Sequence, residues 1–197
     1  MPTDTPSGQL LARRKASFDT ETALAAAKIV SGLARTQGLA AAICGGLAMH
    51  LYGFARATQG IDMVASGLLR EVTPEKQLSY GGIRFTIEVA LRRVAVDWIA
   101  RDDFFRDFYE AALAEAESLG EGLHIISANW MVTLKYIAGR EQDQTDLLWL
   151  LRQPGMVERA QVLAHFDRVM GPPAAVFPKR EMANLFIQAD VSSEYEQ

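Results

Sequence analysis

Residues 40–66, AAAICGGLAMHLYGFARATQGIDMVAS, contain the features that decide the fold. The short apolar run Ala40–Cys44 is typical of a buried strand. A glycine pair and a helical pattern from Leu47 to Tyr52 follow it, and a second apolar segment, Gly60–Ser66, then carries one acid, Asp62. This order predicts a strand, a glycine turn, a helix and a second strand that bears a carboxylate.

Such a unit suits phosphate and metal chemistry. Gly45 and Gly46 have no Cβ, so the backbone there can approach a ligand closely. The N–H groups that begin the next helix, together with its dipole, favour an anion such as a phosphate. Asp62 on the following strand can bind a hard cation such as Mg²⁺. The same sequence pattern also occurs where the glycine pair only forms a tight turn and the acid lies at the surface. The unit by itself therefore leaves open whether it binds a ligand.

The same residues resemble the nucleotidyltransferase superfamily, most closely its small bacterial members related to abortive-infection and toxin–antitoxin nucleotidyltransferases. The matching residues are Gly45-Gly46-Leu47-Ala48, Tyr52-Gly53, Arg56-Ala57-Thr58 and Ile61-Asp62. A later segment, Leu134–Arg140 followed by Asp143 and Asp146, resembles a helical element of that group. The two matches stand in the family's order and together span roughly residues 40–150.

The resemblance implies a fold and an activity. The fold is α/β (α+β), a mixed sheet flanked by helices with a helical C-terminal half. The activity is the transfer of a nucleoside monophosphate from a nucleoside triphosphate to a hydroxyl of RNA or protein with Mg²⁺. The family role would be the toxin of a toxin–antitoxin pair, with an antitoxin as a possible partner.

The resemblance also assigns roles to single residues. The catalytic residues would be Asp62, Asp97 and Lys135, of which Asp62 and Asp97 would hold the metal. The nucleotide would be bound by Gly45, Gly46, Arg56, Thr58 and Lys135. Asp143 and Asp146 would support the site by holding a lysine or an arginine. Without the resemblance, Lys135 reads as a surface lysine and the acid pair as part of a solvated helix face.

Asp97 is the candidate for the family's third acid. It alternates with the apolar residues of Arg93–Ile99, so it lies on a largely apolar strand face, where a lone carboxylate costs several kcal/mol. It should therefore bind a cation or form a salt bridge, for which the candidates are Arg56, Arg92 and Arg93. Glu88, at the end of the preceding strand, is either a replacement for the missing carboxylate at Gly60 or, as is more common for such a residue, exposed to solvent.

Gly60 is a departure from the family pattern. The family has an acid there, two residues before Asp62, and residues two apart on a strand point to the same side. One metal ligand of the pair is thus missing. The alternative function is a degenerate nucleotidyltransferase-fold module, catalytically weak, that binds nucleotide or a protein partner.

Length and composition limit the remaining possibilities. The 197 residues suit a flexible arm (1–18), a nucleotidyltransferase-like core (19–100) and a mainly helical region packed on it (101–190). We expect helices at residues 102–119, 156–170 with His165 exposed, and 179–189. A net charge of −4 provides no global basic field for nucleic acid. The lone Cys44 reads as a core residue, and no apolar run reaches ~20 residues, so a cytoplasmic protein without a membrane span is expected.

Overall fold

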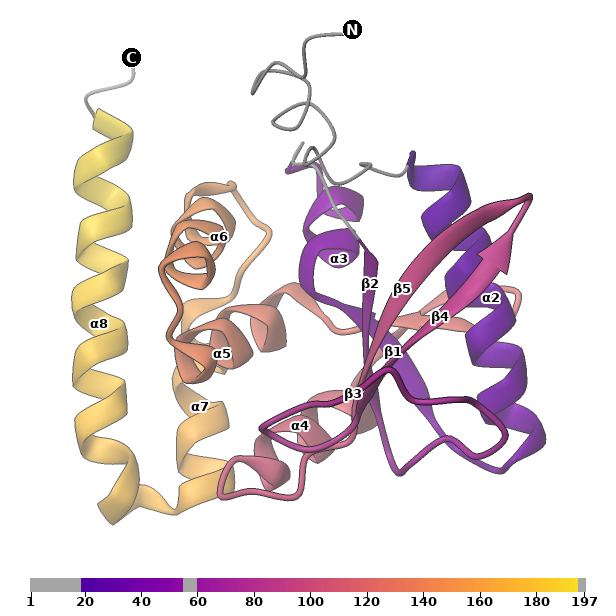
Figure 1. Ribbon diagram of the computed structural model, residues 1–197. Coiled ribbons are helices and arrows are strands. Elements are labelled where there is room, and N and C mark those ends of the chain that lie inside the picture. The colour runs from indigo at the N-terminus through magenta and orange to yellow at the C-terminus, as the bar shows by residue number, and fades with distance from the viewer. Residues whose placement is uncertain (1–18, 55–59, 195–197) are drawn as a thin grey trace, which may run out of the picture.

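A computed structural model describes residues 19–54 and 60–194. The predicted arm, residues 1–18, lies outside the described residues, as do Arg56 and Thr58. Figure 1 shows a central sheet with helix α2 on one side and helices α5 to α8 on the other. None of the helices within the described ranges combines the length and apolarity that a membrane crossing requires.

The sheet has seven strands in the order β3-β4-β5-β2-β1-β7-β6. The strands are β1 (Ala41–Cys44), β2 (Gly60–Ala65), β3 (Lys76–Gln77), β4 (Ile83–Val89), β5 (Arg92–Ile99), β6 (Glu117–Gly120) and β7 (Leu123–Ile125). Strand β2 runs antiparallel to β1 and parallel to β5, and β1 runs parallel to β7. The sheet is therefore mixed, as predicted.

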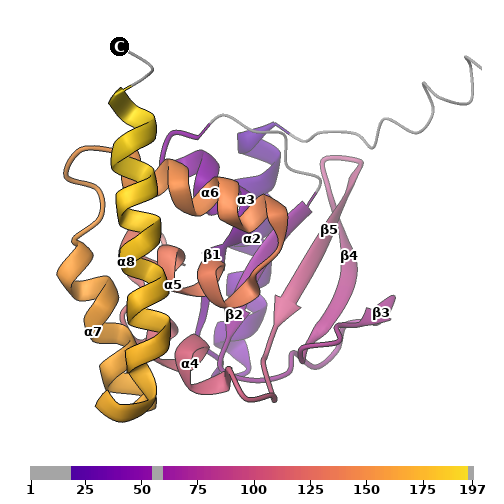
Figure 2. The same cartoon turned by 90° about the vertical axis from the view of Figure 1, so that its left-hand side faces the viewer.

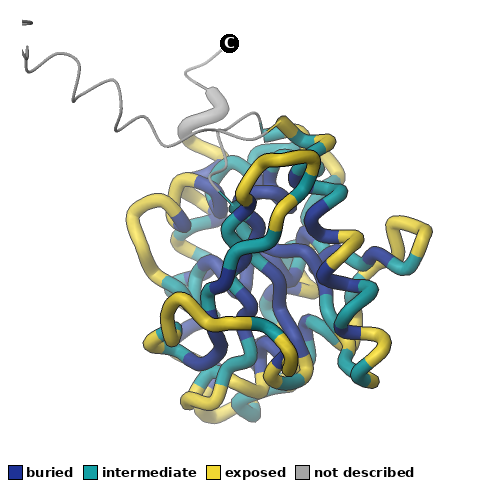
Figure 3. Tube along the Cα trace, turned by 45° about the vertical axis from the view of Figure 1, so that its right-hand side comes forward, coloured by how far each residue is buried: buried dark blue, intermediate teal, exposed yellow. Residues whose placement is uncertain are grey.

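Helix α2 (Thr20–Thr36) covers one face of the sheet because its inner side is made of small residues. Ala23, Ala26, Ala27, Val30 and Ala34 are all buried. Asp19 caps the helix by accepting a hydrogen bond from the Thr22 N–H at 2.7 Å. The short helix α3 (Gly45–Leu51) follows β1 directly and contacts β1 and β2. Figure 3 shows that the buried segments gather in the middle of the molecule.

Five helices make up the other half of the chain. They are α4 (Arg106–Ala114), α5 (Ala128–Ala138), α6 (Glu141–Arg152), α7 (Arg159–Met170) and α8 (Pro172–Glu194). Figure 2 shows α5, α6 and α8 stacked in front of the sheet, with α7 beside them. Ser127 caps α5 by accepting a hydrogen bond from the Trp130 N–H.

Three of the sequence-based expectations are wrong. The helix expected over 102–119 ends at Ala114, and residues 117–120 form β6, because they pair with β7 and extend the sheet beyond β1. The last helix begins at Pro172, not 179, because proline is tolerated in a first helical turn. His165 is buried, not exposed, because it stacks on Trp130 with ring centroids 3.6 Å apart.

Candidate functional site

The glycine pair contacts the predicted acid directly. Strand β1 pairs with β2 so that Cys44 lies opposite Asp62, and this register brings the turn after Cys44 to the carboxylate. Gly45 has φ +58°, and a Cβ there would lie 2.0 Å from Asp62 Oδ2. The Gly46 N–H donates a hydrogen bond to the same oxygen at 3.3 Å. Only glycine fits at position 45, and the turn holds Asp62 in place.

Asp62 and Asp97 are neighbours on parallel strands. The register of β2 and β5 places them opposite each other, on the same face of the sheet. Burial raises the pKa of the Asp62 carboxyl, and the negative charge of Asp97 raises it further. The Gly46 N–H, Lys135 and Arg140 act in the opposite direction. Two carboxylates in this arrangement favour a bound cation.

The cation that Asp97 contacts is Arg84, which the sequence analysis did not consider. Arg84 Nε and Nη2 donate to the two Asp97 oxygens at 2.5 and 2.6 Å, a bidentate pair. The proposed partners Arg92 and Arg93 are wrong, because both form ion pairs with other acids. Arg56 lies outside the described residues.

The partner of Asp97 follows from the register of one hairpin. Strands β4 and β5 are joined at Ala90 and Leu91, both with positive φ, which is the geometry of a type I′ turn. Counting outward from that turn places Arg84 opposite Asp97. Identifying this two-residue turn in the sequence would have predicted that Arg84 pairs with Asp97. Glu88 is exposed and lies four residues from Arg84, about 13 Å along the strand, so it is not part of the site.

Lys135 lies between two acids in the helical half. Its Nζ is 2.9 Å from Asp143 Oδ1 and 2.7 Å from Asp146 Oδ2. All three side chains are buried, with 6%, 2% and 0% of their surface exposed. Lys135 is therefore not a surface lysine, and the acid pair is not on a solvated face. The turn at Gly139, which has φ +65°, ends α5 and lets α6 return over it.

Arg140 completes this charge cluster from its edge. Its guanidinium donates to both oxygens of Asp143, with Nε at 2.5 Å and Nη2 at 3.1 Å. Burial acts to raise the pKa of the Asp143 carboxyl, yet that pKa lies below its ordinary value because Arg140 and Lys135 stabilise the ionised form. Two cations and two acids thus neutralise one another, with Arg140 71% exposed and the other three side chains buried.

Several of these groups line one pocket of about 290 Å³, which we call the site pocket; Asp97, Arg84 and Asp146 are not among its lining residues. Gly45 and Asp62 contribute from the sheet side, and Lys135 and Arg140 from the helical side. A further wall is made by an arginine and aromatic rings that the sequence analysis did not single out: Arg101, Tyr80, Phe105 and Tyr109. The Arg101 guanidinium lies 4.7 Å from the Tyr109 ring centroid. Burial raises the pKa of Tyr109 to about 12, so its hydroxyl remains protonated at neutral pH.

The two strand carboxylates are too few to form a metal centre by themselves. Within the described part of the chain, no cluster of three or more acidic, histidine or cysteine side chains could hold a metal. Mg²⁺ is commonly held by one or two carboxylates together with substrate phosphates. Asp62 and Asp97 could provide the carboxylates. A Cβ at Gly60 would lie 2.6 Å from the Ala95 carbonyl oxygen, so β5 closely approaches the backbone where the family has its other acid.

One other predicted residue, Cys44, can be placed, and two, Arg56 and Thr58, cannot. Cys44 is buried, and burial raises the pKa of its thiol well above the ordinary value, which agrees with a core residue. Arg56 and Thr58, predicted to bind nucleotide, lie outside the described residues.

Comparison with known proteins bears on the fold. No protein-family model matches the sequence, and comparison with curated proteins finds no relative. Among solved structures, the chain is similar to the crystal structure of an antigenic nucleotidyltransferase-like protein from Paracoccidioides brasiliensis. The TM-score is 0.52 at 12% identity, over 87% of this chain and 94% of that one. This chain therefore has a nucleotidyltransferase-like fold.

Proposed function

We propose that the chain binds a nucleoside triphosphate with Mg²⁺ in the site pocket and transfers its nucleoside monophosphate to a hydroxyl of RNA or protein. The observation that carries the proposal is the register of β2 and β5, which sets the Asp62 and Asp97 carboxylates side by side. Asp62 lines the same pocket as Lys135 and Arg140. Acids that favour a cation and basic groups that favour phosphate thus occur together.

The acidic residues and Lys135 would bind different parts of the nucleotide complex. Asp62 and Asp97 would hold Mg²⁺, which when bound neutralises phosphate charge. A lysine has three N–H donors, and Asp143 and Asp146 occupy two of those of Lys135. The third can bind a phosphate oxygen, with the ammonium fixed in position by the two acids. At about 290 Å³ the pocket is small for a ligand site, so we assign it to the phosphate and metal end of the nucleotide.

The second candidate is the degenerate module, and Gly60 and Arg84 favour it. The acid that would complete the donor set is replaced by a glycine against which β5 packs. Both oxygens of Asp97 already accept from Arg84, so a metal must compete with a bidentate arginine. In this case the protein binds nucleotide or a partner protein and transfers little.

Calorimetric titration with each nucleoside triphosphate, with and without MgCl₂, tests the binding step. The wild type is compared with Asp62→Ala and with Asp107→Asn, which removes an exposed acid of α4. We expect Mg²⁺-dependent binding that Asp62→Ala abolishes and Asp107→Asn preserves. Absence of binding in the wild type contradicts the transferase and leaves the degenerate module only as a fold that binds a partner protein.

Transfer separates the two candidates. The wild type is incubated with triphosphates labelled at the α-phosphate and with cellular RNA or protein, and covalently bound label is measured. Label that depends on Asp62 supports the transferase. Binding without transfer, followed by transfer in Gly60→Asp, supports the degenerate module.

The toxin role is also part of the proposal and rests on the resemblance. Induced expression in a bacterial host should arrest growth, and Asp62→Ala should not. Co-expression with the adjacent reading frame should relieve the arrest if that frame encodes an antitoxin. Normal growth with full-length wild-type protein present would contradict this role.

A further inference from the structure

A second pocket lies at the opposite end of β1 from the site pocket. It measures about 230 Å³ and is formed between α2, the start of β1, the end of α4 and β7. We call it the α2–β7 pocket. Ala41 lines this pocket and Cys44 lines the site pocket. The two residues are three apart on β1, about 10 Å along the strand. The two pockets share no lining residue.

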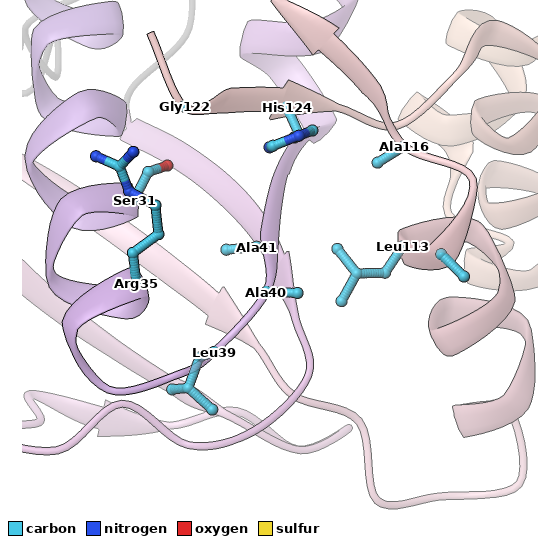
Figure 4. A pocket seen from close by; sticks show the side chains of 10 residues that line it. Ser31, Arg35, Leu39, Ala40, Ala41, Leu113, Ala116, Gly122 and His124 are labelled. Carbon is cyan, nitrogen blue, oxygen red and sulfur yellow. The ribbon is translucent and has the colours of Figure 1, made fainter.

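The α2–β7 pocket has a polar and an apolar side. Figure 4 shows the Arg35 guanidinium, the Ser31 hydroxyl and the His124 ring toward one side, and Leu39, Ala40 and Leu113 toward the other. Arg35 and Ser31 are four residues apart on α2, so they lie on the same face of that helix. His124 comes from β7, and the polar groups thus converge from two elements.

Arg35 is an exposed cation that has no counter-charge among the residues that the structure describes. Among the described residues it has no ion pair and no hydrogen bond, whereas Lys28 on the same helix pairs with Glu121. Its guanidinium lies against the backbone of Gly122, where a Cβ would be 2.2 Å from Arg35 Nη1. Glycine at 122 thus leaves the space that the guanidinium occupies. A guanidinium fork is suited to a carboxylate or phosphate.

Ser31 gives an independent indication of a ligand. The residue is only 4% exposed, it lines the pocket, and its hydroxyl has no hydrogen-bond partner within the described structure. A buried hydroxyl without a partner costs free energy, and such groups are rare in folded proteins. A ligand oxygen in the pocket would give this hydroxyl its partner.

We infer that the α2–β7 pocket binds a small monocarboxylate with a short apolar chain. Arg35 binds the carboxylate, Ser31 donates a hydrogen bond to it, and the apolar chain lies against Leu39 and Leu113. One unpaired arginine balances one negative charge, which selects a monoanion over a phosphate dianion. The apolar side selects a carbon chain over an inorganic ion. The pocket volume limits the ligand to a few carbon atoms.

Titration of ¹⁵N-labelled full-length protein tests this inference. The probes are butyrate, 1-butanol, which has the same chain without the charge, and inorganic phosphate. We expect saturable shifts of the Ala41, Gly122 and His124 amides with butyrate, and at least tenfold weaker binding of butanol and phosphate. Arg35→Gln should weaken butyrate binding about tenfold or more, as the loss of a charged hydrogen bond implies. Arg180→Gln, which removes an exposed arginine of α8, should leave binding unchanged.

Thermal unfolding of Ser31→Ala adds a readout that a purely structural role does not change. The variant should be at least as stable as wild type without ligand and should gain less stability from saturating butyrate. No amide shifts with millimolar butyrate would overturn the inference. So would equal binding of butyrate and butanol, phosphate binding tighter than butyrate, or an Arg35→Gln variant that binds butyrate normally.

Discussion

Replacing Lys135 with methionine should destabilise the protein strongly. The substitution keeps an unbranched side chain of similar length but removes the charge that lies 2.9 Å from Asp143 and 2.7 Å from Asp146. Asp143 retains Arg140, but the carboxylate of Asp146 then loses the ammonium it faces in a fully buried position. Removing one partner of a buried ion pair costs about 3–5 kcal/mol.

The size of this loss can be compared with a solvent-accessible pair in the same chain. Lys179 contacts Asp167 at 2.7 Å, but both side chains are 35% exposed. An exposed pair contributes about 0–1 kcal/mol, so Lys179→Met is the matched control. For a protein of this size, 3–5 kcal/mol corresponds to a fall in Tm of roughly 6–20 °C.

Urea unfolding of Lys135→Met, Asp146→Asn and the double variant measures the interaction free energy between Lys135 and Asp146. The double variant should be more stable than the sum of the two single losses predicts, by about 2 kcal/mol or more, because each single loss already includes the contact between Lys135 and Asp146. The reasoning is refuted if Lys135→Met loses no more than Lys179→Met. Strict additivity of the two single losses would also refute it.

Three further predictions concern other residues. Burial and the charge of Arg168 lower the pKa of His165 to about 4. Between about pH 6.5 and 4 the unfolded chain therefore binds more protons than the folded chain, and the free energy of unfolding should fall by about 2 kcal/mol from pH 7 to pH 5. Urea titrations should find a smaller fall in His165→Gln. Gly45→Ala should lose Mg²⁺–nucleotide binding and be clearly less stable than Gly155→Ala, since both glycines have positive φ but only Gly45 faces Asp62; equal stability and intact binding in calorimetry would contradict this. Gly60→Asp should destabilise the chain by about 1–3 kcal/mol in urea unfolding because its Cβ meets the Ala95 carbonyl, and wild-type stability would show that β5 moves away without cost.

Local sequence determined the elements around the glycine pair. The apolar run, the two glycines, the helical pattern and the strand with Asp62 appear in the structure in that order, because each depends on residues close together in the chain. The small-residue face of α2 and its Asp19 cap likewise depend on residues that are close together in the chain. The resemblance proposed Asp97 as the third acid, and its alternation with apolar neighbours, which is also local, placed it on an apolar strand face.

Only the tertiary structure decided which charges meet. Asp97 contacts Arg84 because a two-residue turn fixes the register of β4 and β5. Residues 117–120 form a strand because β7 offers them an edge to pair with, although their own sequence continues a helical pattern. The ion pairs of Lys135 and the unpartnered Ser31 hydroxyl depend on how helices pack, and packing joins residues that no sequence period relates. The sequence alone thus determined the elements and their candidate residues, whereas strand register and helix packing decided the partners of each charge.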